Sequence, residues 1–410
     1  MSETLAIDGG VPVRDTKASH WPTWPDNTER EWEEEIVPIL KEVYLGHTEG
    51  LPAPVGHRFG QAFAAYCDAA YGVMMPSGTT SIAAGLSAAL DLDGLVDGGE
   101  VIIPNYTFIA TASAPLSVRC SLALVDIDPV SFTMSPEAVE AAITDQTVAL
   151  LPVHLGGHPA DMDAINDIAS KHNLKVIEDC AQAHGAEHKG RKVGSLGHVG
   201  AFSFQSSKNL TSGEGGCLLT NDRDLRDRAW AFRDVGRRPG GERWEYPRLG
   251  WNYRTSEYLA GILLKRLPKL EPQIDLRNKN AAYLSKGLDE IGGLEPPRWH
   301  PWVTQHGYHL YMMRYNSEAF GGKNRGEFIA ALQAEGIPCT PGYQRPLTDE
   351  GGLKTVMDRH PHLIRRLPCP HVEAICASSV WFLQNMLLGE REDMDDILTA
   401  VAKIKRAFAA

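Results

Sequence analysis

Short apolar runs alternate with helix-like segments between residues 72 and 223 of the chain. Each run is closed by turn residues, which is typical of strands buried in a sheet. Strands that alternate with helices predict a mainly parallel sheet with helices on both faces, whose ligand crevice lies beyond the carboxyl ends of the strands. The runs expected to form strands are Val101–Ile103, Leu122–Val125, Val148–Val153, Lys175–Ile177, Val199–Ser203 and Cys217–Leu219. Among the connecting segments, Ser135 can cap a helix whose first turn contains Pro136.

After residue 223 the alternation stops and a different mixture of elements follows. The elements expected there are a helix from about residue 256 to 284 that Pro268 interrupts, a strand at 308–315, and helices at 325–335 and 394–408. They indicate a smaller α+β domain. We therefore expect a large domain over residues 1–255, with an N-terminal arm at 1–40, and a linking helix and small C-terminal domain over 256–410.

Charge and cysteine content exclude several classes of protein. The 410 residues include 40 Lys and Arg against 52 Asp and Glu, a formal net charge of −12, with no basic block. We therefore expect no nucleic acid and no membrane surface as a partner. Seven cysteines without a C-x-x-C pair fit reduced thiols. With no signal-peptide pattern and no apolar stretch approaching about 18 residues, the sequence predicts a cytoplasmic protein.

Three polar segments stand at the ends of expected strands. Ser77–Thr80 follows the apolar run Val73–Met75 and opens an apolar helix, so its free N–H groups suit a phosphate. Taken alone, this short motif favours a plain helix cap. Asp179 follows a buried strand, where its charge needs a partner. The alternative is that Asp179 is the N-cap of a helix. Lys208 lies in the loop before a glycine-rich turn, where most lysines are solvated. An anion cradle, a strand-end acid and a loop lysine in this order are what a phosphate-bearing aldehyde cofactor requires.

Several longer motifs resemble the DegT/DnrJ/StrS family of PLP-dependent sugar aminotransferases, and the resemblance covers nearly all of the chain. It implies the type I PLP-dependent aminotransferase fold, an α/β class with a mainly parallel mixed sheet in its large domain and a smaller α+β C-terminal domain. The segments that carry the resemblance are Pro76–Thr79, Pro104–Thr111, Asp126–Asp128, His154–Asp163, Glu178–Gly185, Ser203–Gly216 and Gly250–Arg254.

The resemblance also implies roles for residues around pyridoxal 5′-phosphate. Lys208 would form the internal aldimine and shuttle the proton, which requires surroundings that lower its pKa. Asp179 would keep the pyridine nitrogen protonated, so that the ring acts as an electron sink. Gln182 would bond the 3′-oxygen, and Phe108 would stack on the ring unless it is simply core.

Other residues would hold the phosphate or the substrate. The family pattern assigns the phosphate to Gly78, Thr79 and Ser203, joined by Asn252 of a neighbouring subunit, which implies a homodimer with composite active sites. His154 and Tyr343 stand in segments similar to those that line the substrate pocket in relatives, and either could be core instead.

The family resemblance predicts transfer of an amino group from L-glutamate or L-glutamine to a keto-cyclitol or keto-sugar, through pyridoxamine phosphate. Lys208 favours transamination, because dehydratase members carry histidine at that position. The segment Leu5–Val13 resembles the branch that acts on keto-cyclitols such as scyllo-inosose and on aminoshikimate-type substrates. The alternatives are an enzyme for nucleotide-linked keto-sugars and a catalytically silent PLP-binding regulator.

Two other enzyme classes fit less well, and we expect no metal. His184 to His188 matches H-x-x-E-H, but Gly185 argues against the helix that zinc chemistry needs. His154 and His158 are separated by two glycines, which are poor helix formers.

A nicotinamide dehydrogenase would need a different glycine spacing from that of Gly194–Gly200. The Trp- and Arg-rich segment 237–248 contains acids, so it indicates an ordered interface or substrate loop rather than a nucleic-acid surface.

Overall fold

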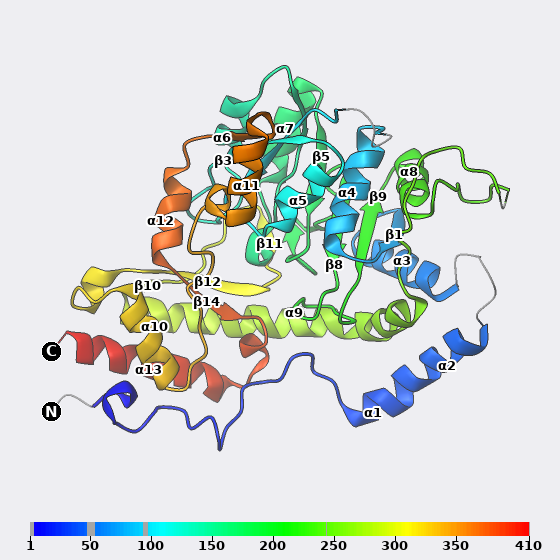
Figure 1. The fold of residues 1–410 in the computed structure, drawn as a ribbon. Helices are drawn as coiled ribbons and strands as arrows, with labels where there is room; N and C mark the ends of the chain where they lie inside the picture. Colours follow the sequence, from blue (N-terminus) through cyan, green and yellow to red (C-terminus); the bar gives the residue numbers. More distant parts are fainter. Residues whose placement is uncertain (1–3, 47–53, 93–96, 243, 410) are drawn as a thin grey trace.

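A large sheet forms the centre of the chain in the computed structural model, which describes residues 4–46, 54–92, 97–242 and 244–409 (Figure 1). Within these residues the sheet has eight strands in the order β1-β9-β8-β5-β4-β2-β3-β13. The strands from β8 to β13 pair in parallel, whereas β9 is antiparallel to both β8 and β1. The expected mainly parallel sheet is therefore confirmed. The strands are β1 (Tyr71–Met75), β2 (Glu100–Pro104), β3 (Ser121–Val125), β4 (Thr147–Leu150), β5 (Lys175–Asp179), β8 (Val199–Ser203), β9 (Gly216–Thr220) and β13 (Ile364–Arg366).

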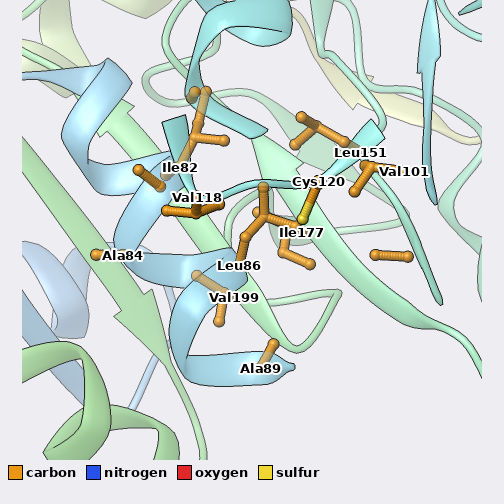
Figure 2. Packing of buried hydrophobic residues seen from close by; sticks show 14 of the residues in the cluster. Ile82, Ala84, Leu86, Ala89, Val101, Val118, Cys120, Leu151, Ile177 and Val199 are labelled. Atoms are coloured by element: carbon orange, nitrogen blue, oxygen red, sulfur yellow. The ribbon is translucent and has the colours of Figure 1, made fainter. Parts of the chain in front are cut away.

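Helices cover both faces of this sheet, as the apolar strands predict. The helices α4 (Gly78–Ala89), α5 (Ala110–Ser117) and α8 (Arg223–Arg233) pack on the face that presents Val101 and Ile103. Figure 2 shows part of this core, with Leu86 of α4 beside Ile177 and Val199 of the sheet. On the opposite face, α6 (Pro136–Ala142) and α7 (Met162–His172) pack against Ile102. The helices α3 (Pro54–Tyr66) and α9 (Glu257–Ile291) pack against Phe202.

Local sequence signals explain several helix ends. Ser135 lies immediately before α6, its hydroxyl accepts a hydrogen bond from the Ala138 N–H at 3.2 Å, and Pro136 is the first helical residue. The helix α9 contradicts its expected interruption, because it continues through Pro268 and Pro272. A proline inside a helix costs roughly 3 kcal/mol. Buried Leu263, Leu270 and Ile274 on either side of Pro268 hold the helix against the core, so packing outweighs the local cost.

The C-terminal part contains a second, smaller sheet with its own core. Its strands are β10 (Leu294–Glu295), β12 (Leu310–Tyr315) and β14 (Ser379–Leu383), and α10 (Arg325–Ala334) and α13 (Arg391–Phe408) contribute to the same core. The N-terminal segment also packs here. Arg14 forms ion pairs with Asp393 and Asp396, and the Lys403 ammonium donates a hydrogen bond to the Val11 carbonyl. Figure 1 shows this segment running beside α13.

One segment from beyond residue 256 belongs to the large sheet. The strand β13 pairs in parallel with β3, placing Ile364 opposite Leu122, while Leu353 of α11 (Gly351–Arg359) packs into the same core as α4. The domain boundary expected at residue 256 stays a prediction. Beyond residue 256, the chain leaves the small sheet after β12, adds β13 to the edge of the large sheet and returns to the small sheet as β14.

The remaining described α- and π-helices are α1 (Glu29–Glu31), a π-helix at Trp32–Ile36, α2 (Val37–Gly46) and α12 (Pro370–Ser378). Short 3₁₀ helices lie at Ala6–Asp8, Leu155–Gly157, Ser317–Phe320, Leu347–Asp349, Pro361–Leu363 and Met386–Leu388. A three-stranded sheet is formed by β11 (Val303–Gln305), β6 (Glu187–His188) and β7 (Arg191–Lys192). All seven cysteines are free and buried. No helix within the described ranges combines the length and apolar character that a bilayer crossing demands.

Candidate active site

A cavity of about 570 Å³ opens at the carboxyl ends of β5 and β8, where the parallel sheet is expected to bind a ligand. Its walls come from the ends of the strands, from the first turn of α4 and from the segments around β12 and β14. The predicted site residues that line this cavity are Gly78, Thr79, Phe108, Asp179, Gln182, Ser203, Lys208 and Tyr343.

The first turn of α4 provides an anion cradle on one wall. Ser77 caps the helix: its hydroxyl accepts from the Thr80 N–H at 3.2 Å, and the Thr80 hydroxyl accepts from the Ser77 N–H at 3.1 Å. The N–H groups of Gly78 and Thr79 have no acceptor within the helix, because they belong to its first turn. A Cβ at Gly78 would lie 2.8 Å from the Cβ of Ser203, so only glycine allows the helix to approach the end of β8 this closely.

Asp179 ends β5 with its carboxylate buried at the floor of the cavity. Thr111 donates a hydrogen bond to Oδ2 at 2.8 Å, and the Ala181 N–H donates to Oδ1 at 3.1 Å. Burial raises the pKa of Asp179 above its ordinary value, although these hydrogen bonds and the nearby Lys208 oppose the shift. No described helix begins directly after Asp179, so the carboxylate caps a turn rather than a helix.

Lys208 reaches the same cavity from the loop between β8 and β9. Burial lowers the pKa of its amine from 10.5 to about 8, and the negative charge of Asp179 opposes part of this shift. Within the described ranges, its Nζ forms no hydrogen bond or ion pair. A buried amine without a fixed partner and with a lowered pKa is a competent nucleophile and base near neutral pH.

The side walls are formed by Phe108, Gln182 and Tyr343. The ring of Phe108 is 56% exposed, which excludes the alternative that it is core. The amide oxygen of Gln182 accepts from the Gly156 N–H at 2.8 Å, and its Nε2 approaches the Tyr343 hydroxyl at 3.5 Å. Tyr343 packs edge-on against Trp381, with ring centroids 4.9 Å apart. These contacts hold polar groups in fixed positions above the strand ends.

Comparison with known proteins decides the family. Residues 33–402 match the DegT/DnrJ/EryC1/StrS aminotransferase family. The chain belongs to this family. It is 38% identical to L-glutamine:2-deoxy-scyllo-inosose aminotransferase of Streptoalloteichus tenebrarius, over 98% of this chain and 97% of that protein.

Solved structures agree with this assignment. The crystal structure of S. venezuelae DesV has a TM-score of 0.80 and 31% identity, and the match covers 96% of this chain and 98% of that one. For 3-amino-5-hydroxybenzoic acid synthase the TM-score is 0.81 and the identity 26%, with 94% and 98% covered. The expected type I aminotransferase fold is confirmed, and the protein is an aminotransferase, so the alternative of a silent regulator is not supported.

Two predicted site residues of this aminotransferase lie outside the cavity wall. His154 is completely buried, and both of its ring nitrogens have partners: Nε2 lies 3.0 Å from Glu178 Oε2, and Nδ1 accepts from the Ala160 N–H at 3.0 Å. It therefore has no free group for a substrate. Asn252 is exposed beside Asp234, away from the cavity of its own chain. Its expected role in a neighbouring subunit stays a prediction.

Sequence reasoning missed two residues of the aminotransferase site, Thr111 and His309. Thr111 orients the Asp179 carboxylate, and its hydroxyl lies 2.9 Å from that of Thr107. Thr107 lies before α5 and Thr111 in its first turn, so helical spacing in the sequence did not indicate the pair. His309 lines the cavity just before β12, and no sequence signal pointed to it.

The histidine motifs do not form a zinc site. His184 is buried between Phe202 and Phe204, whereas His188 lies on the short strand β6. In the described part of the chain, one group of possible metal ligands is His154, Glu178 and Cys180. The Glu178 carboxylate already accepts hydrogen bonds from the N–H groups of Gly194, Leu196 and Gly197. This carboxylate therefore serves to hold the loop beside β5.

Proposed function

We propose that this aminotransferase uses pyridoxal 5′-phosphate to transfer the amino group of L-glutamine, or of L-glutamate, to the keto group of a cyclitol. The observation that carries the proposal is that Lys208, Asp179 and the N-terminus of α4 share one cavity. The acceptor class is supported by the 38% identity to an enzyme named for 2-deoxy-scyllo-inosose and L-glutamine.

The residues present fit pyridoxal 5′-phosphate. Its phosphate needs N–H donors at a helix N-terminus, and the space beside Gly78 is too narrow for a Cβ. Its aldehyde needs an accessible amine with a lowered pKa, which Lys208 provides. Its ring nitrogen needs a carboxylate, and Asp179 is buried and held by two hydrogen bonds. The exposed ring of Phe108 offers a flat apolar surface for stacking.

Each residue then has a defined task. When bound, the cofactor supplies an aldehyde for amino-group exchange and a ring that withdraws electrons. Asp179 holds a proton on the ring nitrogen, and Thr111 keeps the carboxylate in place. Neutral Lys208 removes the proton from Cα of the amino donor, which a general base with a pKa near the working pH does best. Gln182 Nε2, which lies 3.5 Å from the Tyr343 hydroxyl, is the donor that would bond the 3′-oxygen of the cofactor.

The proposal includes a cytoplasmic homodimer in which Asn252 contributes to the partner's cavity. Exposure of Asn252 and of aromatic side chains nearby, such as Trp251 at 48%, supports this arrangement. Trp251 is followed directly by Asn252, so a partner that covers the one would contact the other.

A competition between acceptors tests the proposed function. The purified protein, loaded with pyridoxal 5′-phosphate and supplied with L-glutamine, is offered scyllo-inosose, 2-deoxy-scyllo-inosose and a nucleotide-linked keto-sugar together. We expect amination of the cyclitols, detected by mass spectrometry. Preferential amination of the nucleotide-linked sugar would assign the enzyme to the other branch, and no amination with any donor would refute the proposal.

A further inference from the structure

His309 lines the same cavity as Lys208, and none of the steps above uses it. It stands one residue before β12 and is only 7% exposed. The neighbouring residue along the cavity wall, Leu310, is apolar, as is Leu383 opposite it on β14. The imidazole is therefore a polar group that directly adjoins apolar side chains of the wall.

Asn209 fixes the orientation and the tautomer of this imidazole. The Asn209 Nδ2 donates a hydrogen bond to the Gly307 carbonyl at 2.6 Å, so its amide oxygen faces the other way. That oxygen lies 3.3 Å from His309 Nδ1. Because an amide oxygen can only accept, the hydrogen of the neutral ring must be on Nδ1. Nε2 then carries a lone pair, and it has no partner among the residues that the structure describes.

The charges around His309 keep it neutral and select what it can bind. Burial holds the pKa of His309 well below its ordinary value, and the nearby Lys208, His184 and Arg277 lower it further. Arg277 is a cation, as is Lys208 whenever its amine is protonated, so an ammonium group is disfavoured at Nε2. The lone pair also repels a carboxylate. An uncharged hydrogen-bond donor is the group that suits this position, and the ring hydroxyls of a polyhydroxylated ketone are donors of this kind.

We propose that His309 Nε2 accepts a hydrogen bond from a ring hydroxyl of the acceptor ketone and so makes the second half of the reaction selective for polyhydroxylated ketones. The inference rests on the proposed function, since it assumes that the acceptor is a cyclitol. A buried acceptor that a ligand leaves unpaired costs free energy, and this is how a polar group in a cavity discriminates between ligands. L-Glutamate carries neither a hydroxyl nor an amide N–H, so the half-reaction with this amino donor should be indifferent to His309.

The two half-reactions are measured separately. His309→Phe keeps the ring volume but removes the acceptor, and we expect kcat/KM for scyllo-inosose to fall by about tenfold or more. The affinity of the pyridoxamine-phosphate enzyme for scyllo-inosose, measured by isothermal titration calorimetry, should weaken by a similar factor. The rate of the absorbance change with L-glutamate, which lacks a neutral hydrogen-bond donor in its side chain, should stay within about threefold. His309→Gln, whose amide oxygen can replace Nε2, should recover most of the loss.

A matched control separates this role from a structural one. His306 is equally buried near the start of β12 but does not line the cavity, so His306→Phe should cause no selective loss with scyllo-inosose. The inference is overturned if His309→Phe affects both half-reactions equally or neither, or if His306→Phe gives the same selective loss. An unsubstituted enzyme that responds to L-glutamine but aminates no cyclitol would instead refute the proposed acceptor, and with it this role.

Discussion

The Thr111 hydroxyl donates a hydrogen bond of 2.8 Å to Oδ2 of Asp179, where the second residue of α5 meets the carboxyl end of β5. The Thr111 hydroxyl in turn lies 2.9 Å from that of Thr107. A buried carboxylate with a raised pKa thus stays in place through two hydroxyls, one on α5 and one in the segment just before this helix. Because Asp179 must be ionised to hold a proton on the cofactor ring, these hydroxyls should influence the pH dependence of the enzyme.

Replacing Thr111 by Val should move the acid limb of the pH–rate profile to higher pH. Loss of a hydrogen bond to the ionised form raises the pKa of Asp179 further, so the active carboxylate is lost earlier as the pH falls. A hydrogen bond to a charged group contributes about 1.5–3 kcal/mol, so the acid limb should move by about 1–2 pH units. The measurement is kcat/KM against pH, with Thr107→Val as a control that leaves the bond to Asp179 intact. An unshifted limb would contradict the role of Thr111.

Replacing Asp179 by Asn should abolish transamination and stabilise the cofactor-free protein. Burial raises the folded-state pKa of Asp179 above its unfolded value, so between these two values the native state binds more protons. Its contribution to stability is therefore present at low pH and lost as the pH rises through the folded pKa. The asparagine amide stays neutral and so loses no stability as the pH rises. The midpoint temperature of thermal unfolding at pH 7 should therefore increase. An unchanged or lower midpoint temperature would show that the hydrogen bonds from Thr111 and Ala181 already offset the cost of burying the carboxylate.

Incorporation of pyridoxal 5′-phosphate should follow the titration of Lys208. The ammonium form is not nucleophilic, and burial lowers the pKa of this amine to about 8. The loading rate should therefore rise with pH around a midpoint near 8 and then level off. Borohydride trapping followed by peptide mapping should place the label on Lys208. Lys192, whose ammonium is paired with Glu187 and Glu271 at 3.0 Å, is the control and should stay unlabelled. A label on another lysine would contradict the proposed site.

Gly78→Ala tests the anion cradle. The new Cβ would lie 2.8 Å from that of Ser203, so the first turn of α4 must move away from β8. Overpacking of this kind costs about 1–3 kcal/mol, and we expect most of it to appear as weaker binding of pyridoxal 5′-phosphate in a fluorescence titration. Gly351→Ala, at the first residue of α11, meets no atom within 4 Å and serves as the matched control. Equal affinity of both variants would exclude a phosphate at this helix.

Local patterns were enough to predict the sheet, its parallel character and the residues at the strand ends. The apolar runs are contiguous in sequence, Asp179 ends β5, and Lys208 lies in the loop that follows β8. The side-chain direction of His154 could not be predicted this way. It turns inward because Glu178 and the Ala160 N–H satisfy its two nitrogens, and these contacts appear only when the chain is folded.

Long-range contacts explain the other differences. The interruption expected at Pro268 followed from a local rule, which the packing of α9 against α3 and the sheet overrides. The pair of Asn209 and His309 joins the lysine loop to the start of β12 across 100 residues of chain. No sequence pattern around Asn209 or His309 indicates that these two residues will be in contact.

Mixing two inactive variants tests the composite active site. Lys208→Ala lacks the reacting amine, and Asn252→Ala lacks the group that each subunit would lend to its partner. In a dimer that contains one of each, the Asn252→Ala subunit supplies Lys208 and receives Asn252 from its partner, so one of the two cavities is complete. Random association of equal amounts after unfolding and refolding should therefore restore about one quarter of the wild-type sites. Activity is measured before and after exchange, with each variant refolded alone as the control. If the mixture gains no activity, while size-exclusion chromatography shows that subunits have exchanged, Asn252 does not act across the interface.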